Sequence, residues 1–352
     1  MKNKIIIILM MILCIAFSGC TTKKSDNEGS KSFTRVPDIE IQKQIEEANG
    51  KDFRIIDLSY YSRAISSNTI GDTPTRTVSV YLPPDYFDND HKTYPVIYFL
   101  DGYECNAKSF LRRNKVSLDK AFNEKNAFLM VAVDGNNISG GSFYVNSPVS
   151  GNWEDYLSQE LVSLIDNNFR SKPGSQYRGL SGYSMGGFGA LYTAFRHPDI
   201  FGSVMVFAPG AFAEEDIDMV MKSWRGDRRL LTSYAQAFSP DAAVEKNQGN
   251  IPSFDGSDSD QIYVDNWLNG FSGWQKKIDN YLGQQARLNA IAIAYSESDY
   301  YKWIPGGCKH LDKLLTDSKI EHEIYNYKGG HIVPRGFIES YYTPFFGAVF
   351  NK

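Results

Sequence analysis

A serine flanked by glycines stands at residues 182–186, where the sequence reads Gly182-Tyr183-Ser184-Met185-Gly186. The Gly-x-Ser-x-Gly pattern is typical of a nucleophilic serine on a tight turn between a strand and a helix. An apolar segment, 177–180, precedes it and a helix-forming segment, 185–196, follows it. Side chains at 182 and 186 would clash as the backbone folds back, which explains the two glycines. Ser184 is therefore predicted to be a nucleophile at a helix N-terminus, where free N–H groups favour negative charge.

A nucleophilic serine needs a general base, and the chain offers five histidines: His91, His197, His310, His322 and His331. In a strand–turn–helix hydrolase the chain order is serine, acid, histidine, which excludes the first. His197 ends an expected helix, His310 lies within an expected helix, and His322 begins an expected strand. His331 alone follows an expected strand, in the loop Gly329-Gly330-His331, where an imidazole can reach the serine. His331 is the predicted base.

The acid that orients the histidine is expected after a strand between Ser184 and His331. The apolar segment 290–295 is followed by Ser296-Glu297-Ser298-Asp299, so Glu297 and Asp299 both qualify. The oxyanion formed during ester attack needs two N–H donors. One is the backbone N–H of Met185, directly after the nucleophile. The other is expected in the turn after the apolar segment 95–100, near Gly102 and Tyr103.

Alternating strands and helices are expected to position these groups. The apolar runs 95–100 and 128–133 have the continuous pattern of strands covered on both faces, and 53–65 with 75–82 form an antiparallel pair. Further strands are expected at 201–208 and 321–327, and helices at 117–126, 153–169, 306–317 and 335–350. This order predicts an α/β fold with a mostly parallel sheet and helices on both faces. Residues 213–288 lack this alternation of strand and helix patterns and are expected to be an insertion, or cap, of undetermined fold.

The N-terminus has the pattern of an export signal, with Lys2 and Lys4 before a short apolar run. Phe17-Ser18-Gly19-Cys20 resembles a bacterial lipobox, in which the cysteine carries the lipid. We therefore expect a signal peptide at 1–19, lipidation at Cys20, a flexible tether at 20–50 and a hydrolase domain at 51–352. The expected location is an exported lipoprotein of the periplasm or cell surface. Of the remaining cysteines, Cys105 and Cys308 could pair or stay separate thiols.

Composition limits the partners. The formal net charge is −4, so the chain has no basic excess for a phosphate backbone and no nucleic-acid partner is expected. Aromatic residues make up 14% of the sequence. Four tryptophans lie in the insertion or just beyond Asp299, and a ring- or sugar-stacking wall over Ser184 is the hypothesis for them: Trp224, Trp267, Trp274 and Trp303.

With these residues assigned, the chain resembles the Putative esterase family of α/β-hydrolases, over residues 78–331. That family includes esterase D, feruloyl and acetyl xylan esterases, enterochelin esterases and mycobacterial mycolyltransferases. The resemblance implies Asp299 as the acid, because Ser296 takes the place of a strand-closing glycine three residues before it, and it implies Tyr103 as the second oxyanion donor. The turn reads Leu-Asp-Gly where the family commonly has Leu-His-Gly. The strongest segments are 94–102, 156–161, 179–190 with Arg196-His197-Pro198, and 325–331.

The resemblance implies acyl-ester chemistry by Ser184, His331 and Asp299, without a metal or organic cofactor. The substrate would be a small-molecule or polysaccharide ester, and the lipid anchor would bind the membrane. Three functions remain open. The first is a serine carboxylic-ester hydrolase at the cell envelope, acting on acetyl or feruloyl esters of carbohydrates. The second is an acyltransferase with the same triad. The third, which the complete triad disfavours, is a non-catalytic carbohydrate-binding lipoprotein.

Overall fold

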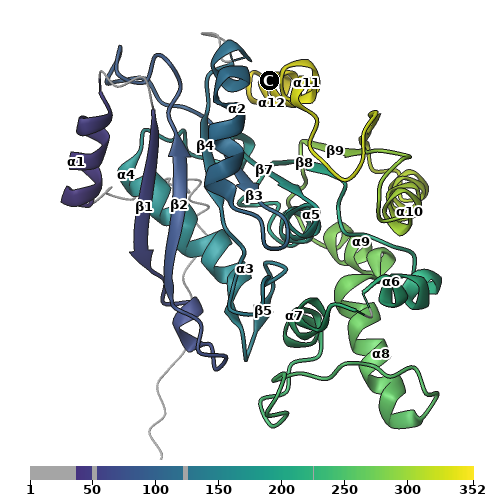
Figure 1. The fold of residues 1–352 in the computed structure, drawn as a ribbon. Helices are drawn as coiled ribbons and strands as arrows, with labels where there is room; N and C mark the ends of the chain where they lie inside the picture. Colours follow the sequence, from purple (N-terminus) through teal and green to yellow (C-terminus); the bar gives the residue numbers. More distant parts are fainter. Residues whose placement is uncertain (1–36, 50–53, 122–125, 225) are drawn as a thin grey trace, which may run out of the picture. The chain divides into compact units, whose positions relative to one another are not determined.

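A mixed sheet is the centre of the computed structural model, which describes residues 37–49, 54–121, 126–224 and 226–352 (Figure 1). The first pairings, β1–β2 and β2–β4, are antiparallel, and all later ones are parallel. The expected antiparallel pair and mostly parallel sheet are thus confirmed. In spatial order the strands are β1 (Ile55–Tyr61), β2 (Thr75–Tyr81), β4 (Leu129–Val133), β3 (Val96–Leu100), β7 (Arg178–Tyr183), β8 (Ser203–Phe207), β9 (Ala290–Tyr295) and β10 (Glu323–Asn326). A separate two-residue pair joins β5 (Asn146–Ser147) to β6 (Gly151–Asn152).

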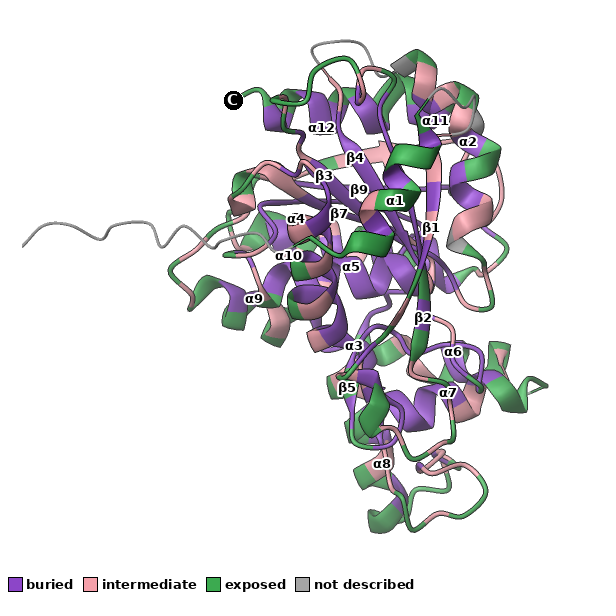
Figure 2. Cartoon of the chain, turned by 90° about the vertical axis from the view of Figure 1, so that its left-hand side faces the viewer, coloured by how far each residue is buried: buried purple, intermediate pink, exposed green. Residues whose placement is uncertain are grey.

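Both faces of the central strands are buried, as the continuous apolar runs predict. In β3, Tyr98 and Leu100 pack into one hydrophobic cluster and Ile97 and Phe99 into another on the opposite face. Every residue of β3, β4 and β8 is buried. Figure 2 shows β3 in the colour of buried residues, among the other central strands. The strands can be apolar throughout because helices exclude water from both sides.

Helices form a layer on each face of the sheet (Figure 1). One face carries α2 (Ala107–Ala121), α11 (Arg335–Phe337) and α12 (Thr343–Phe350), the last two joined by a π-helical turn. The other layer consists of α1 (Ile39–Ala48), α3 (Trp153–Asp155), α4 (Val162–Asn168), α5 (Met185–Arg196) and α10 (Trp303–Asp317). A π-helical turn makes α3 and α4 continuous, so the amphipathic helix expected at 153–169 is present.

Two expectations about local structure need correction. Helix α2 begins ten residues before the expected helix 117–126, because Asn106 caps its first turn and Phe110 and Leu111 add buried apolar positions. Residues 39–48, assigned to the tether, form α1 instead. The Asp38 side chain caps α1, and Ile41 and Ile45 are buried against the domain. A polar-looking segment is ordered here by a few apolar residues at helical spacing.

In the described part of the region between β8 and β9, which the sequence left unassigned, a short 3-10 helix (Glu214–Asp216) is followed by four α-helices. These are α6 (Ile217–Ser223), α7 (Arg228–Phe238), α8 (Asp258–Phe271) and α9 (Trp274–Leu282). Two aspartates, Asp258 and Asp260, lie in the first turn of α8, and Ser257 caps the helix. The Asp260 carboxylate accepts the backbone N–H groups of Ser253 and Phe254. Rings from α7 and α8 pack together, with Tyr234 and Phe271 at 4.8 Å between centroids. The aromatic rings of the insertion therefore pack with one another and join the main hydrophobic core through Phe143 and Phe188.

The predicted signal peptide, the Cys20 lipidation site and residues 20–36 of the tether lie outside the described residues. Within the described part, none of the helices combines the length and apolar character that crossing a membrane requires. Cys105 and Cys308 are both free thiols, which decides between the two states left open for them.

Candidate active site

Ser184 occupies a strained turn between β7 and α5. Its φ and ψ are 55° and −117°, a conformation that residues with a side chain rarely adopt. A Cβ atom on Gly182 would lie 2.1 Å from the Gly186 carbonyl oxygen, and one on Gly186 would lie 2.0 Å from the Leu100 carbonyl oxygen. Only glycine fits at either position, so the backbone folds back as the sequence pattern predicts. The turn presents the serine at the first turn of α5.

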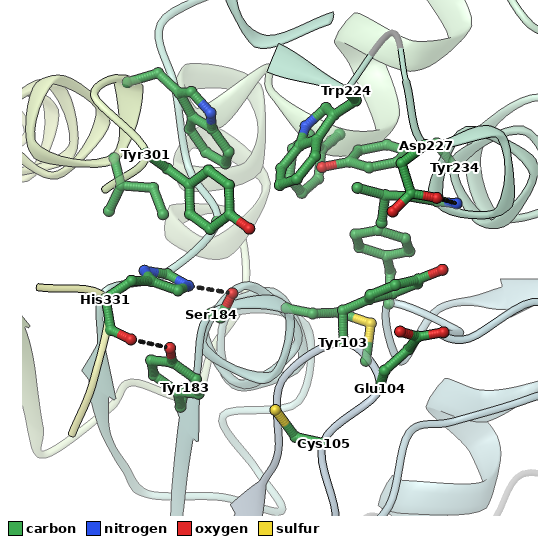
Figure 3. A pocket seen from close by; sticks show the side chains of 17 residues that line it. Tyr103, Glu104, Cys105, Tyr183, Ser184, Trp224, Asp227, Tyr234, Tyr301 and His331 are labelled. Carbon is green, nitrogen blue, oxygen red and sulfur yellow. Dashed lines mark hydrogen bonds between the residues drawn. The ribbon is translucent and has the colours of Figure 1, made fainter. Parts of the chain in front are cut away.

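Ser184, His331 and Asp299 form a continuous chain of hydrogen bonds (Figure 3 shows its serine–histidine link). The Ser184 Oγ lies 2.8 Å from His331 Nε2, and His331 Nδ1 lies 2.9 Å from Asp299 Oδ2. The three residues come from the ends of β7, β10 and β9, which are brought together at the carboxyl edge of the sheet. This is the geometry of a serine nucleophile with its general base and orienting acid.

Burial separates the two candidate acids. Asp299 is 0% exposed, and its second oxygen accepts the Tyr301 backbone N–H at 2.8 Å. The Glu297 side chain is 53% exposed and pairs with Lys309 at 2.9 Å. The structure therefore places Asp299 on the histidine and leaves Glu297 as a solvated loop charge.

The histidine loop is held by groups that the sequence reasoning missed. The Tyr183 hydroxyl donates to the His331 carbonyl oxygen at 2.5 Å, and the Ser298 hydroxyl donates to the Gly329 carbonyl oxygen at 2.6 Å. Ser296, which stands where the family has glycine, also donates to Gly329. The only signal for Tyr183 was its place inside the Gly-x-Ser-x-Gly pattern. These bonds fix the main chain on either side of the imidazole.

The two expected oxyanion donors lie on the same cavity as Ser184. Parallel pairing of Leu100 with Gly182 puts the turn after β3 beside the nucleophile turn. Tyr103 and Met185 both line the cavity. Met185 is the first residue of α5, where an N–H has no partner within the helix. The Tyr103 N–H has no acceptor among the described residues. Neither N–H group therefore has a protein acceptor in the described part of the chain, which is what an oxyanion donor requires.

A cavity of about 330 Å³ opens over Ser184 and His331, with walls that are largely aromatic (Figure 3). Leu230 and Ile304 add aliphatic surface, and Glu104 and Asp227 are its acidic residues. Glu104 pairs with Arg229, whereas Asp227 caps α7 through the Leu230 N–H. The aromatic lining consists of Tyr103, Phe143, Tyr183, Trp224, Tyr234, Phe271, Tyr301 and Trp303.

Two of the four tryptophans assigned to a substrate wall lie elsewhere. Trp224 and Trp303 line the cavity, with ring centroids 6.3 Å apart. Trp267 is 2% exposed and stacks on Tyr234 inside the insertion, and Trp274 is 1% exposed against Phe188. The expectation for Trp267 and Trp274 is therefore wrong, because their rings form the core between the insertion and α5.

Burial sets the protonation of other groups around the cavity. It raises the pKa of the Tyr103 hydroxyl to about 12, and it raises the pKa values of the Tyr183 and Tyr301 hydroxyls above their ordinary range. These hydroxyls remain protonated donors at neutral pH. Burial also raises the pKa of the Cys105 thiol to about 11, which keeps it from competing as a thiolate nucleophile.

The fold and this site define a serine hydrolase of the α/β-hydrolase class. The Putative esterase family pattern matches residues 67–266, more than half of the chain, so the chain belongs to that family. The matched range includes Ser184 and ends before Asp299 and His331. The chain is accordingly a serine carboxylic-ester hydrolase, and the resemblance noted from its motifs is confirmed.

Solved structures with the same fold include several esterases. An S-formylglutathione hydrolase from Staphylococcus aureus is 15% identical with a TM-score of 0.57, covering 86% of this chain and 100% of that chain. A fluorophosphonate-binding serine hydrolase from the same species is 16% identical with a TM-score of 0.55, at the same coverage. A ferulic acid esterase from Anaeromyces mucronatus, solved with ferulic acid, is 18% identical with a TM-score of 0.53, covering 86% and 93%. At these identities the likeness establishes the fold.

Proposed function

We propose that this chain hydrolyses acyl esters of carbohydrates, of the acetyl or feruloyl type, at the cell envelope, using Ser184, His331 and Asp299. One observation carries the chemistry: the hydrogen-bonded chain that starts at the buried Asp299 and runs through His331 ends at Ser184, in a cavity that Tyr103 and Met185 also line. A structural serine would not need a buried carboxylate two hydrogen bonds away from it.

The reaction follows from the geometry. Ser184 Oγ bonds to the ester carbonyl carbon while its proton passes to His331 Nε2, and the Met185 and Tyr103 N–H groups hold the resulting oxyanion. His331 then gives the proton to the alcohol as the carbon–oxygen bond to the leaving group breaks. Water attacks the acyl-enzyme, its proton passes to His331, and the acid leaves as Ser184 recovers the proton. Asp299 keeps the imidazole oriented and stabilises its charged form throughout.

The cavity lining supports an aromatic or sugar-bearing substrate. Trp224, Tyr301 and Trp303 pack against one another, with the Trp224 and Tyr301 rings 4.7 Å apart, and supply flat faces next to Ser184. Tyr300, 78% exposed, lies beside Tyr301 outside the cavity lining. Flat aromatic faces stack on a cinnamoyl ring or on the apolar face of a sugar. A structural neighbour solved with ferulic acid supports the same substrate class.

The envelope location rests on the N-terminal sequence. Residues 1–19 have the pattern of a signal peptide, and Cys20 follows small residues as in a lipobox. We expect the full chain, expressed in a bacterium, to incorporate labelled fatty acid and to fractionate with membranes, and a Cys20→Ser variant to lose the label. Labelling that persists in Cys20→Ser would place the lipid elsewhere, and an unlabelled wild-type chain would end the anchor proposal.

The substrate is tested with purified residues 21–352 on a panel of aryl acetates, feruloyl-sugar esters and long-chain esters, with and without sugar acceptors. We expect turnover of acetyl and feruloyl esters with release of free acid. The Ser184→Ala variant should fold and lose activity by about 10⁴-fold or more, since the nucleophile is absent. Unchanged activity in Ser184→Ala contradicts the mechanism. Acyl transfer to the sugar, with little free acid, would instead indicate a transferase.

A further inference from the structure

The turn that carries the second oxyanion donor, residues 101–105, is held by a neighbouring segment that has no role in the proposed function so far. This bracing segment comprises residues 135–144, directly after β4. Eight of its ten residues are buried; Asn136 is intermediate and Ile138 exposed. The segment contacts the turn from one side and the start of α5 from another, so it adjoins both donors.

Tyr144 anchors the bracing segment under the turn. Its ring is fully buried, and its hydroxyl lies 3.0 Å from the Asp101 carbonyl oxygen and 3.1 Å from that of Val133, so its one proton bridges the ends of β3 and β4. Tyr144 and its neighbour Phe143 both have positive φ, 56° and 54°. Two consecutive strained residues persist only where the surrounding contacts determine the backbone.

The ring of Tyr144 packs directly against two glycines from other parts of the chain, and neither position has room for a side chain. A Cβ on Gly135 would lie 2.4 Å from Tyr144 Cζ, and a Cβ on Gly189, in α5, would lie 2.6 Å from Tyr144 Cδ2. The ring therefore connects the turn after β3 to the helix whose first residue is Met185.

Further bonds run directly from the bracing segment to the turn. The Tyr103 hydroxyl donates to the Ser139 carbonyl oxygen at 3.0 Å, and the Glu104 N–H donates to the Gly140 carbonyl oxygen at 3.2 Å. The Asn136 side-chain amide donates to the Cys105 carbonyl oxygen at 2.6 Å. Three consecutive residues of the turn are thus bonded to one segment.

Gly141 lies between the two donor residues. A Cβ at this position would lie 2.4 Å from Met185 Sδ and 2.8 Å from Tyr103 Cδ2. Its φ is not positive, so alanine could adopt the same backbone conformation, and only these side-chain contacts oppose it. One added methyl group would therefore push on the side chains of both oxyanion residues. The flexible Met185 thioether can move aside, whereas the Tyr103 ring is held by its hydrogen bond to Ser139 and would carry the displacement to the turn.

We propose that the bracing segment, residues 135–144, sets the spacing of the Tyr103 and Met185 N–H donors, with Gly141 as the spacer and Tyr144 as the anchor. Both are positioning residues that act through Tyr103 and Met185. The inference rests on the proposed function, since it concerns the oxyanion donors of that reaction.

The test compares Gly141→Ala with Gly306→Ala in residues 21–352. Gly306 lies in α10, and a Cβ there would meet nothing within 4 Å, so it is a matched control. We expect Gly141→Ala to lower kcat on an aryl acetate by about tenfold to a hundredfold, with KM changed by less than about threefold, because a small misplacement of donors acts on the transition state. Gly306→Ala should match the wild type.

An aryl trifluoromethyl ketone supplies a readout that general destabilisation would not change. Ser184 adds to its carbonyl carbon to form a hemiketal whose oxygen occupies the oxyanion position. Its inhibition constant should rise in Gly141→Ala by about the factor by which kcat/KM falls. A kcat equal to that of Gly306→Ala, or a fall in kcat without a change in the inhibition constant, overturns the inference.

Tyr144→Phe removes one hydroxyl and keeps the ring, so it replaces Gly141→Ala if the latter does not fold. It should show the same coupled change in kcat and inhibition constant, smaller than that of Gly141→Ala. Ser184→Ala separates the two hypotheses. Full activity in Ser184→Ala removes the proposed function. A wild type that depends on Ser184, with Gly141→Ala behaving like Gly306→Ala (or Tyr144→Phe doing so where Gly141→Ala does not fold), removes the bracing role alone.

Discussion

Ser184 is held in a backbone conformation that stores about 1–3 kcal/mol of strain, and glycines at 182 and 186 are what make it possible. At the scale of single residues, the sequence was informative wherever sterics or chain order leave few choices. The glycine pattern predicted the nucleophile turn, and the order of the histidines predicted His331. The residue types alone left Glu297 and Asp299 both open, and only the family resemblance implied Asp299. The physical difference between them is burial and one backbone hydrogen bond, which adjacent residues in a polar loop do not reveal.

Asp299→Asn tests that choice. Both oxygens of Asp299 accept hydrogen bonds, one from His331 Nδ1 and one from the Tyr301 N–H, whereas an amide has only one acceptor oxygen. If that oxygen keeps the Tyr301 bond, the NH2 group faces Nδ1 and donates to it, which selects the imidazole tautomer that cannot accept the Ser184 proton. We expect kcat to fall by about 10³-fold to 10⁴-fold with the fold retained, measured by steady-state kinetics and circular dichroism. Glu297→Gln is the matched control and should keep kcat within about twofold, as expected for an exposed loop charge. The reverse ranking of the two variants would assign the acid to Glu297.

At the scale of elements, the strands were the most predictable part, because continuous apolar runs between turn residues have few alternatives. The helices were less so. Helix α1 looked like tether because its polar face dominates its composition, and α2 began earlier than expected because Asn106 supplies the cap. Sequence spacing could place four tryptophans near the insertion, but it could not tell a cavity wall from a core, since both environments select large rings.

Trp224 and Trp274 separate these two environments experimentally. Trp274→Ala removes a ring buried against Phe188 and should lower the free energy of unfolding by about 3–5 kcal/mol. Trp224→Ala opens the cavity wall and should lower kcat/KM for a feruloyl ester by about tenfold, the contribution of one aromatic contact, with a smaller effect on an aryl acetate. Chemical unfolding and kinetics on both esters measure the contrast. Equal destabilisation by both variants, without a change in ester preference, would contradict the wall.

At the scale of the whole molecule, the parallel strand order brings the ends of β3, β7, β9 and β10 to one edge of the sheet, and each end supplies one part of the site. The α/β order of elements and the esterase family were predictable from the sequence because motif and strand pattern agree. The way in which the insertion covers the site was not, because its helices follow no alternation with strands and its core forms from distant rings such as Tyr234 and Phe271.

The central claim is that Ser184 is the residue that becomes acylated, activated by His331. Labelling with an alkyl fluorophosphonate tests it most directly: the serine oxygen bonds to phosphorus as fluoride leaves, and the adduct is stable enough for peptide mapping by mass spectrometry. We predict a single adduct per chain on the peptide containing Ser184, loss of esterase activity in proportion to labelling, and no adduct in Ser184→Ala. An adduct on another residue, or full labelling of Ser184→Ala, would contradict the account.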